Sequence, residues 1–146
     1  MNRSDRERRH HANLERIDEV QVLVGRGERA RVDRIGTVLE QARLMSEELS
    51  SHRSTELGLA ALDRLLRRLE ERGPRKGRDI AEFIAALWND QPLQLRILRG
   101  QDHATGDDMV AVLDAFRFAR LNLVQHVDGG PRRVGRALGR SLPVAG

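Results

Sequence analysis

Few residues in this 146-residue sequence are of types that carry out bond-making chemistry, and they do not gather into a convincing site. The histidines are His10, His11, His52, His103 and His126. Asp102 and His103, followed by Asp107 and Asp108, could bind a divalent metal, but Asp is also the residue type expected where a helix begins. The absence of Cys excludes a thiol nucleophile and a Cys-ligated zinc site. We therefore expect no catalytic residue, no metal and no cofactor, and not an enzyme.

A glycine-containing run, Gly25 to Ala30, matches the pattern G-x-G-x-x-A. In dinucleotide-binding proteins this loop follows one parallel strand, and a second strand follows the next helix. Here a second leucine-rich helix is expected instead. We interpret the run as a short loop rich in Gly and Arg.

Arginine clusters are the clearest signal for an anionic partner. All 26 basic residues except Lys76 are Arg, and the net charge is +4. The segments 64–78 and 129–146 are basic and flank an acidic segment, 79–128. Clustered Arg can neutralise phosphates, meet an acidic protein or remain solvated. The candidate phosphate-contacting residues are Arg64, Arg67, Arg68, Arg72, Arg75, Lys76, Arg78, Arg132 and Arg133.

Trp88 and Asn89 at the end of one predicted helix, and Asp107 and Asp108 at the start of another, are the candidate protein-binding residues. A buried Trp with an Asn near the helix end would be the alternative explanation for the first pair. All four aromatic residues fall on or beside apolar helix faces, and none lies in a basic loop. Base stacking of single-stranded nucleic acid is therefore disfavoured.

The apolar spacing predicts helices that would position these residues. A helix over 28–50 has apolar residues at steps of three or four, and a second over 55–72 ends at Gly73-Pro74. The segment 50–54 is expected to separate them, although one long bent helix also fits because no proline is present there. The stripe of the first helix is Val32, Ile35, Leu39, Ala42, Met45 and Leu49.

Two further helices follow. A helix over 80–90 is expected to begin with a capping box of Asp79 and Glu82. The segment 93–99 fits either a turn of helix or an extended segment that passes over the core. A fourth helix is expected to open at Thr105 with Asp108 as a weaker capping box, and to continue to about residue 127. Its buried stripe is expected to include Met109, Leu113, Phe116, Leu123 and Val127.

The two ends of the chain are expected to be less ordered. Residues 1–27 form a flexible or weakly structured segment, within which 14–24 reads as helix or irregular structure because no strand partner is evident. Residues 28–128 form the helical domain, and 129–146 a basic, mobile tail. The fold class is therefore all-α: a small bundle of three to four main helices with an additional N-terminal amphipathic helix.

Composition limits the other classes of protein. Hydrophobic residues make up 39% and charged residues 33%, within the globular range. No apolar run approaches the roughly 20 residues of a membrane span, and no secretory signal is visible. We expect a cytoplasmic protein that does not interact with membranes.

The stretch from Ala61 to Asp90, followed by the segment with Asp107, Asp108 and Met109, resembles an uncharacterised domain family. That family occurs in short proteins of bacterial conjugative and integrative elements, and the resemblance covers residues 57–127. The matching positions are Leu62, Leu65, Leu66, Phe83, Trp88, Asn89, Asp107, Asp108 and Met109. The resemblance implies an all-α fold and a mobile-element context, and no activity. The linker is unusually basic for the family, and aromatic residues after Trp88 are fewer.

These features favour a small helical protein that binds another protein, as a regulator or inhibitor of host machinery such as a defence complex. The alternative is a basic accessory protein that contacts the nucleic-acid backbone through its Arg clusters. A protein partner is preferred to nucleic acid. Exposure of the apolar face on helix 28–50 would favour a homodimer.

Overall fold

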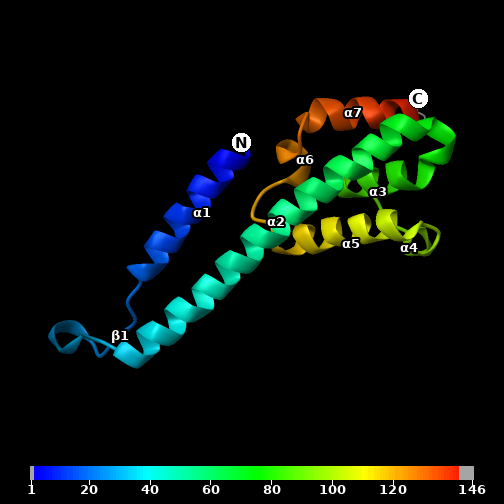
Figure 1. Ribbon diagram of the computed structural model, residues 1–146. Helices are drawn as coiled ribbons and strands as arrows, with labels where there is room; N and C mark the ends of the chain where they lie inside the picture. The colour runs from blue at the N-terminus through cyan, green and yellow to red at the C-terminus, as the bar shows by residue number, and fades with distance from the viewer. Residues whose placement is uncertain (1, 142–146) are drawn as a thin grey trace. The chain divides into compact units, whose positions relative to one another are not determined.

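The computed structural model describes residues 2–141 and confirms the all-α class (Figure 1). Its contacts divide the chain into two units, with the boundary between Arg53 and Ser54. The long helix α2 (Arg34–Lys76) contributes its first part to the N-terminal unit and its second part to the C-terminal unit. The sequence analysis expected a boundary between residues 27 and 28 instead. The two differ because the long helix, which was expected to lie wholly in one domain, is shared between the two units.

The N-terminal unit begins with helix α1 (Arg3–Asp18), in a segment expected to be weakly structured. The Asn2 side chain accepts a hydrogen bond from the Asp5 backbone N–H, and the Asp5 carboxylate accepts one from the Asn2 backbone N–H. This reciprocal cap supplies partners for amides that a helix start leaves open. His10 and Ile17 are buried, so a mostly polar segment becomes a stable helix by packing on one side.

A small hairpin joins α1 to α2. Strand β1 (Leu23–Val24) pairs antiparallel with β2 (Arg31–Val32), and a 3-10 turn, η1 (Gly27–Arg29), lies between them. The glycine-containing run is thus a hairpin loop, and its Gly25 and Gly27 have φ of 90° and 58°, which Gly adopts readily. The partner strand that the sequence did not reveal is only two residues long. Its pairing replaces the first residues of the helix expected over 28–50.

Helix α2 runs through the segment 50–54 without a break, so the single long helix is the correct alternative. The carboxylate of Asp33 accepts a hydrogen bond from the Gly36 N–H at its start. Helical geometry is lost at Gly73, whose φ is 74°, and this confirms the predicted end of the Leu-rich helix.

Up to Ser141, the last described residue, the C-terminal unit adds five helices to the second part of α2. They are α3 (Arg78–Asn89), α4 (Arg96–Arg99), α5 (His103–Phe118), α6 (Leu123–His126) and α7 (Gly130–Ser141). Their apolar residues share one core with the leucines of α2. Gly58 allows α5 to approach closely, because a Cβ on it would clash with the Ala115 Cβ. The fully buried large side chains of this core include Leu62, Leu65, Leu66, Phe83, Ile84, Met109 and Val112.

Both predicted capping boxes of this unit are wrong. Helix α3 begins after Gly77 without a side-chain cap, and Asp79 accepts a hydrogen bond from Gln101 Nε2. The cap of α5 is Asp102, whose side chain accepts from the Thr105 N–H. Asp108 is engaged elsewhere, as described below.

The last predicted helix is split. α5 ends at Phe118, Ala119 is extended, and the Asn122 side chain caps α6 by accepting from the Val124 N–H at 3.0 Å. Phe116, expected in the buried stripe, is 60% exposed. The break redirects the chain so that Leu123 and Val127 still enter the core, but from a different helix axis.

The segment expected to be a mobile tail contains helix α7 up to Ser141, and residues 142–146 lie outside the described part. Val134, Ala137 and Leu138 of α7 are buried in the core. The Arg-rich composition concealed this because only one face of the helix is apolar.

Candidate functional site

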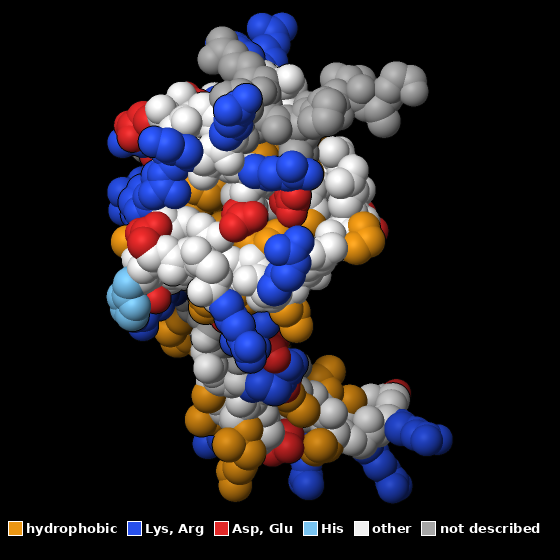
Figure 2. All heavy atoms as spheres, turned by 90° about the vertical axis from the view of Figure 1, so that its right-hand side faces the viewer, with side chains coloured by type: hydrophobic (Ala, Val, Ile, Leu, Met, Phe, Trp, Pro, Cys, Tyr) orange, Lys and Arg blue, Asp and Glu red, His pale blue; other side chains and the backbone are white. Residues whose placement is uncertain are grey.

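Most of the candidate phosphate-contacting residues form ion pairs within the C-terminal unit. Figure 2 shows the consequence on one face, where blue Lys and Arg side chains lie among red Asp and Glu side chains. The paired residues are Arg64, Arg67, Arg68, Arg72, Arg78 and Arg133. In the described part of the chain, Arg75, Lys76 and Arg132 are exposed and have no acidic partner. The Arg clusters therefore offer phosphates less free charge than the sequence suggested.

Asp108 pairs with two of these Arg residues. Its carboxylate accepts from Arg68 Nη1 at 2.7 Å and from Arg64 Nη2 at 2.9 Å. The hydrogen bond to Asp108 raises the pKa of the Arg64 guanidinium. Asp108, expected among the protein-binding residues, is buried, and its carboxylate links α5 to α2.

Arg133 makes a similar link between α7 and α2. Its guanidinium donates to Asp63 Oδ1 at 2.6 Å and to Glu70 Oε1 at 2.7 Å. Burial lowers the pKa of Arg133, but the hydrogen bonds to Asp63 and Glu70 outweigh burial and raise it. This residue serves the fold and is not available to phosphate.

The other candidate protein-binding residues lie at the surface. Trp88 and Asn89 are exposed at the C-terminal end of α3, and Asp107 is exposed on α5, where its carboxylate lies 3.5 Å from His103 Nε2. No hydrogen bond or ion pair joins Trp88 or Asn89 to Asp107 among residues 2–141. The candidate protein-binding residues therefore belong to two helices and are not joined into one site.

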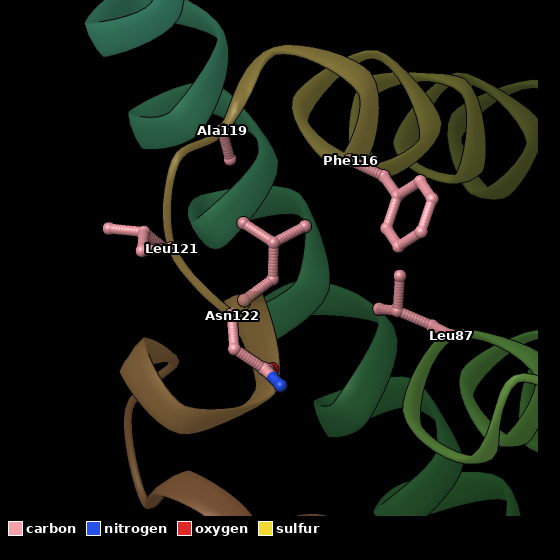
Figure 3. Close-up of a pocket in the computed structure, with 6 residues that line it drawn as sticks. Leu87, Phe116, Ala119, Leu121 and Asn122 are labelled. Atoms are coloured by element: carbon pink, nitrogen blue, oxygen red, sulfur yellow. The ribbon is translucent and has the colours of Figure 1, made fainter.

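A shallow pocket of about 240 Å³ lies where α5 ends and α6 begins. Figure 3 shows the Phe116 ring next to Leu87 at its edge. The lining is Leu87, Phe116, Ala119, Leu121, Asn122 and Leu123. Its one polar residue, Asn122, already caps α6. The lining therefore supplies no group for acid–base or nucleophilic chemistry.

Exposed large apolar side chains lie along the first part of α2, in the N-terminal unit. Along the first part of α2, Ile35, Val38 and Leu39 are 77%, 64% and 65% exposed, and Leu49 is also exposed. We call these four residues the α2 stripe. Figure 2 shows orange hydrophobic side chains exposed at the protein surface. The α2 stripe overlaps the predicted apolar face at Ile35, Leu39 and Leu49.

The opposite, more polar face of the same helix packs against α1. Gln41 Nε2 donates to the backbone oxygens of Asp18 and Val20, and the Thr37 hydroxyl accepts from the Val22 N–H. Polar packing on one side therefore leaves the apolar side uncovered within the N-terminal unit.

A buried polar cluster on this packed face escaped the sequence analysis. His10 Nδ1 lies 2.9 Å from Glu48 Oε1, and Asn13 Nδ2 donates to the same oxygen at 3.1 Å. The His10 ring stacks on the His52 ring with centroids 4.0 Å apart. The members come from two helices far apart in the sequence, so their spacing carries no signal that would have revealed them.

Among the described residues, no group of three or more His, Cys, Asp or Glu side chains has an arrangement that could hold a metal ion. The helices in the same part of the chain include none that is long and apolar enough to cross a membrane.

The fold and these surfaces define a small all-α protein with a leucine-rich core and exposed apolar side chains. Residues 59–141 match a family model, and the chain belongs to this family of unknown function (DUF7673). The match covers most of the C-terminal unit and leaves α1, the hairpin and the α2 stripe outside it. No curated protein and no solved structure matches the chain.

Proposed function

We propose that this is a non-enzymatic protein that acts in the cytoplasm by binding another protein, and that the α2 stripe is its contact face. The observation that carries the proposal is the exposure of Ile35, Val38 and Leu39 on a helix whose other side is packed. Contiguous large apolar side chains at a surface mark interaction sites. An amphipathic helix of a partner would cover a face with this spacing.

A second copy of the chain is the simplest partner, because Val38 and Leu39 follow Ile35 by three and four residues, the spacing at which side chains of paired helices meet. A homodimer would leave the C-terminal unit free for a further protein. The resemblance to proteins of conjugative and integrative elements supports a role as a regulator or inhibitor of host machinery.

Self-association is tested by sedimentation equilibrium with the wild type, Leu39→Glu and Val110→Glu. Val110 is a matched control because it is another exposed apolar residue, 56% exposed, on α5. We expect dimers for the wild type and Val110→Glu, and monomers for Leu39→Glu. If the wild type is a monomer at every concentration, the homodimer is excluded.

A different partner is tested with the same three proteins as baits in an extract of the source cells. We expect at least one protein to bind the wild type and Val110→Glu but not Leu39→Glu. Identical recovery on all three baits, together with a monomeric wild type, would contradict the proposal.

The alternative function is binding of the nucleic-acid backbone through the Arg clusters. Fewer unpaired basic side chains are available for it than the sequence suggested. Arg75, Lys76 and Arg132 are the members without an acidic partner in the described part of the chain. This reduction from nine candidates to three favours the protein-binding proposal over the alternative.

A further inference from the structure

Helix α7 has two chemically distinct faces. Val134, Ala137 and Leu138 are buried on one face. On the other, Arg132 and Arg136 are exposed, one helical turn apart, and neither has an acidic partner among the described residues. Arg133 lies between the two faces and is neutralised by Asp63 and Glu70. The exposed face therefore carries two free guanidinium groups.

The Trp88 ring packs against the edge of this basic face. A Cβ placed on Gly135 would come within 3.2 Å of Trp88 Cη2, so the benzene end of the indole ring contacts α7 at that residue. Gly135 is three residues after Arg132 and one before Arg136, on the edge of the exposed face. Trp88 is 37% exposed. Trp88 lies on an apolar helix and not in a basic loop, as expected, but the packing of α3 against α7 brings its ring to the edge of the basic face.

We propose that Trp88 together with Arg132 and Arg136 forms a binding surface for single-stranded nucleic acid. An unpaired base stacks on the indole ring, and neighbouring phosphates contact the two guanidinium groups. Arg132 and Arg136 are about 6 Å apart along the helix axis, a spacing that a flexible single strand can follow. This surface lies outside the α2 stripe, so the inference does not depend on the proposed function.

The charges around the surface set the type of ligand. Asp90 follows the end of α3 and Asp128 precedes α7. These two negative charges offset the positive charges of Arg132 and Arg136, so the local net charge is small. Binding by charge alone would be weak there, and stacking must contribute. A duplex hides its base faces, so it cannot stack on Trp88 and is expected to bind less tightly.

The sequence provides a direct reporter, because Trp88 is the single Trp and the chain has no Tyr. The intrinsic tryptophan fluorescence of the full-length protein therefore comes from this ring alone. Titration with a 15-nucleotide oligo-dT at low salt should quench the Trp88 emission and saturate in the micromolar range. The logarithm of the affinity should fall with the logarithm of salt with a slope of about −1.4, as expected for two phosphates of a single strand.

Variants are compared by the anisotropy of the labelled oligonucleotide. Trp88→Ala should weaken binding about 10-fold, whereas Trp88→Phe should retain most of it because the aromatic face is kept. Arg132→Gln and Arg136→Gln should each weaken binding and lower the salt slope by about 0.7. Arg99→Gln, an exposed cation on α4, is the control for loss of one positive charge and should bind as the wild type does.

Four results would overturn the proposal. These are no binding at low salt, binding without quenching of Trp88, equal binding of a duplex of the same length, and equal affinity of Trp88→Ala. A poly-glutamate peptide that quenches Trp88 with the same dependence on Arg132 and Arg136 would identify an acidic peptide as the ligand and overturn it as well. Leu39→Glu, which disrupts the α2 stripe, should leave oligonucleotide binding unchanged, so failure of one proposal is distinguishable from failure of the other.

Discussion

The two parts of helix α2 use similar amphipathic sequences in opposite ways. In the C-terminal unit, α2 turns its leucines inward, and Leu62, Leu65 and Leu66 are fully buried. In the N-terminal unit, its Thr37, Gln41 and Glu48 contact α1 or the segment that follows it, while Ile35 and Leu39 face outward. An apolar stripe is therefore not by itself evidence of a core position, since the available neighbour decides which face is covered.

The comparison also explains how each unit is stabilised. The C-terminal unit relies on apolar burial, with the Asp108 and Arg133 ion pairs at its edges. The N-terminal unit has few buried apolar residues and relies on hydrogen bonds such as that of His10 with Glu48. We expect the N-terminal unit to have the lower free energy of unfolding, because net hydrogen-bond contributions are smaller than those of a packed core.

The largest expected effect contrasts one leucine from each part of α2. Leu65→Ala removes a fully buried side chain and should lower the free energy of unfolding by about 2–5 kcal/mol. Leu39→Ala removes a side chain that is mostly exposed and should change it by less than about 0.5 kcal/mol in the monomer. Urea unfolding followed by circular dichroism measures both. Similar losses for the two variants would contradict the assignment of inner and outer faces.

The next effect concerns the two adjacent aspartates of α5. Asp108→Asn should lower the free energy of unfolding by about 1–3 kcal/mol, because it weakens the bonds to Arg64 and the partly buried Arg68. Asp107→Asn is the matched control and should change it by less than about 0.5 kcal/mol, since that carboxylate is exposed. If both variants unfold alike in urea, the ion pairs contribute nothing to stability.

In the N-terminal unit, His10→Ala should loosen α1 while leaving the C-terminal core intact. The change removes the contact with buried Glu48 and the stacking on His52, for a local loss of about 1–2 kcal/mol. Hydrogen exchange should become faster in α1 and remain unchanged in α3 and α5. The neighbouring His11 is exposed, so His11→Ala should leave the exchange of α1 close to that of the wild type.

The smallest effect is expected at the cap of α5. Hydrogen bonds from the Thr105 hydroxyl and backbone N–H, and then the contact with Arg72, lower the pKa of Asp102 in the folded protein. A carboxyl group with a lowered pKa stabilises the fold above its unfolded value of about 3.9 and loses this contribution as the pH falls below it. Asp102→Ala should therefore melt at a slightly lower temperature than the wild type at pH 7. The difference should vanish well below pH 3.9, and a difference independent of pH would contradict this explanation.

Much of the fold could be predicted from the sequence, and much of the candidate site could not. The leucine spacing predicted the second part of α2, and the spacing from Ile80 to Leu87 predicted α3. Both helices have an apolar face with helical periodicity, and both are followed by residues that interrupt a helix. The helix break at Ala119 was missed because α6 is only four residues long, and the packing of α7 was missed because its many Arg residues suggested a mobile tail. The candidate Arg residues were identified by type alone, and their acidic partners lie up to 70 residues away, as for Arg133 and Asp63.

The sequence by itself determined the all-α class, the absence of Cys chemistry and the loss of helical geometry at Gly73, because these follow from composition, period and local backbone preference. Only the tertiary structure decided that Asp108 is buried between two Arg residues, that the α2 stripe faces outward, and that Trp88 lies beside the basic face of α7. Each of these depends on which distant segment packs against the residue, and pairwise packing between distant segments leaves no periodic trace in a single sequence.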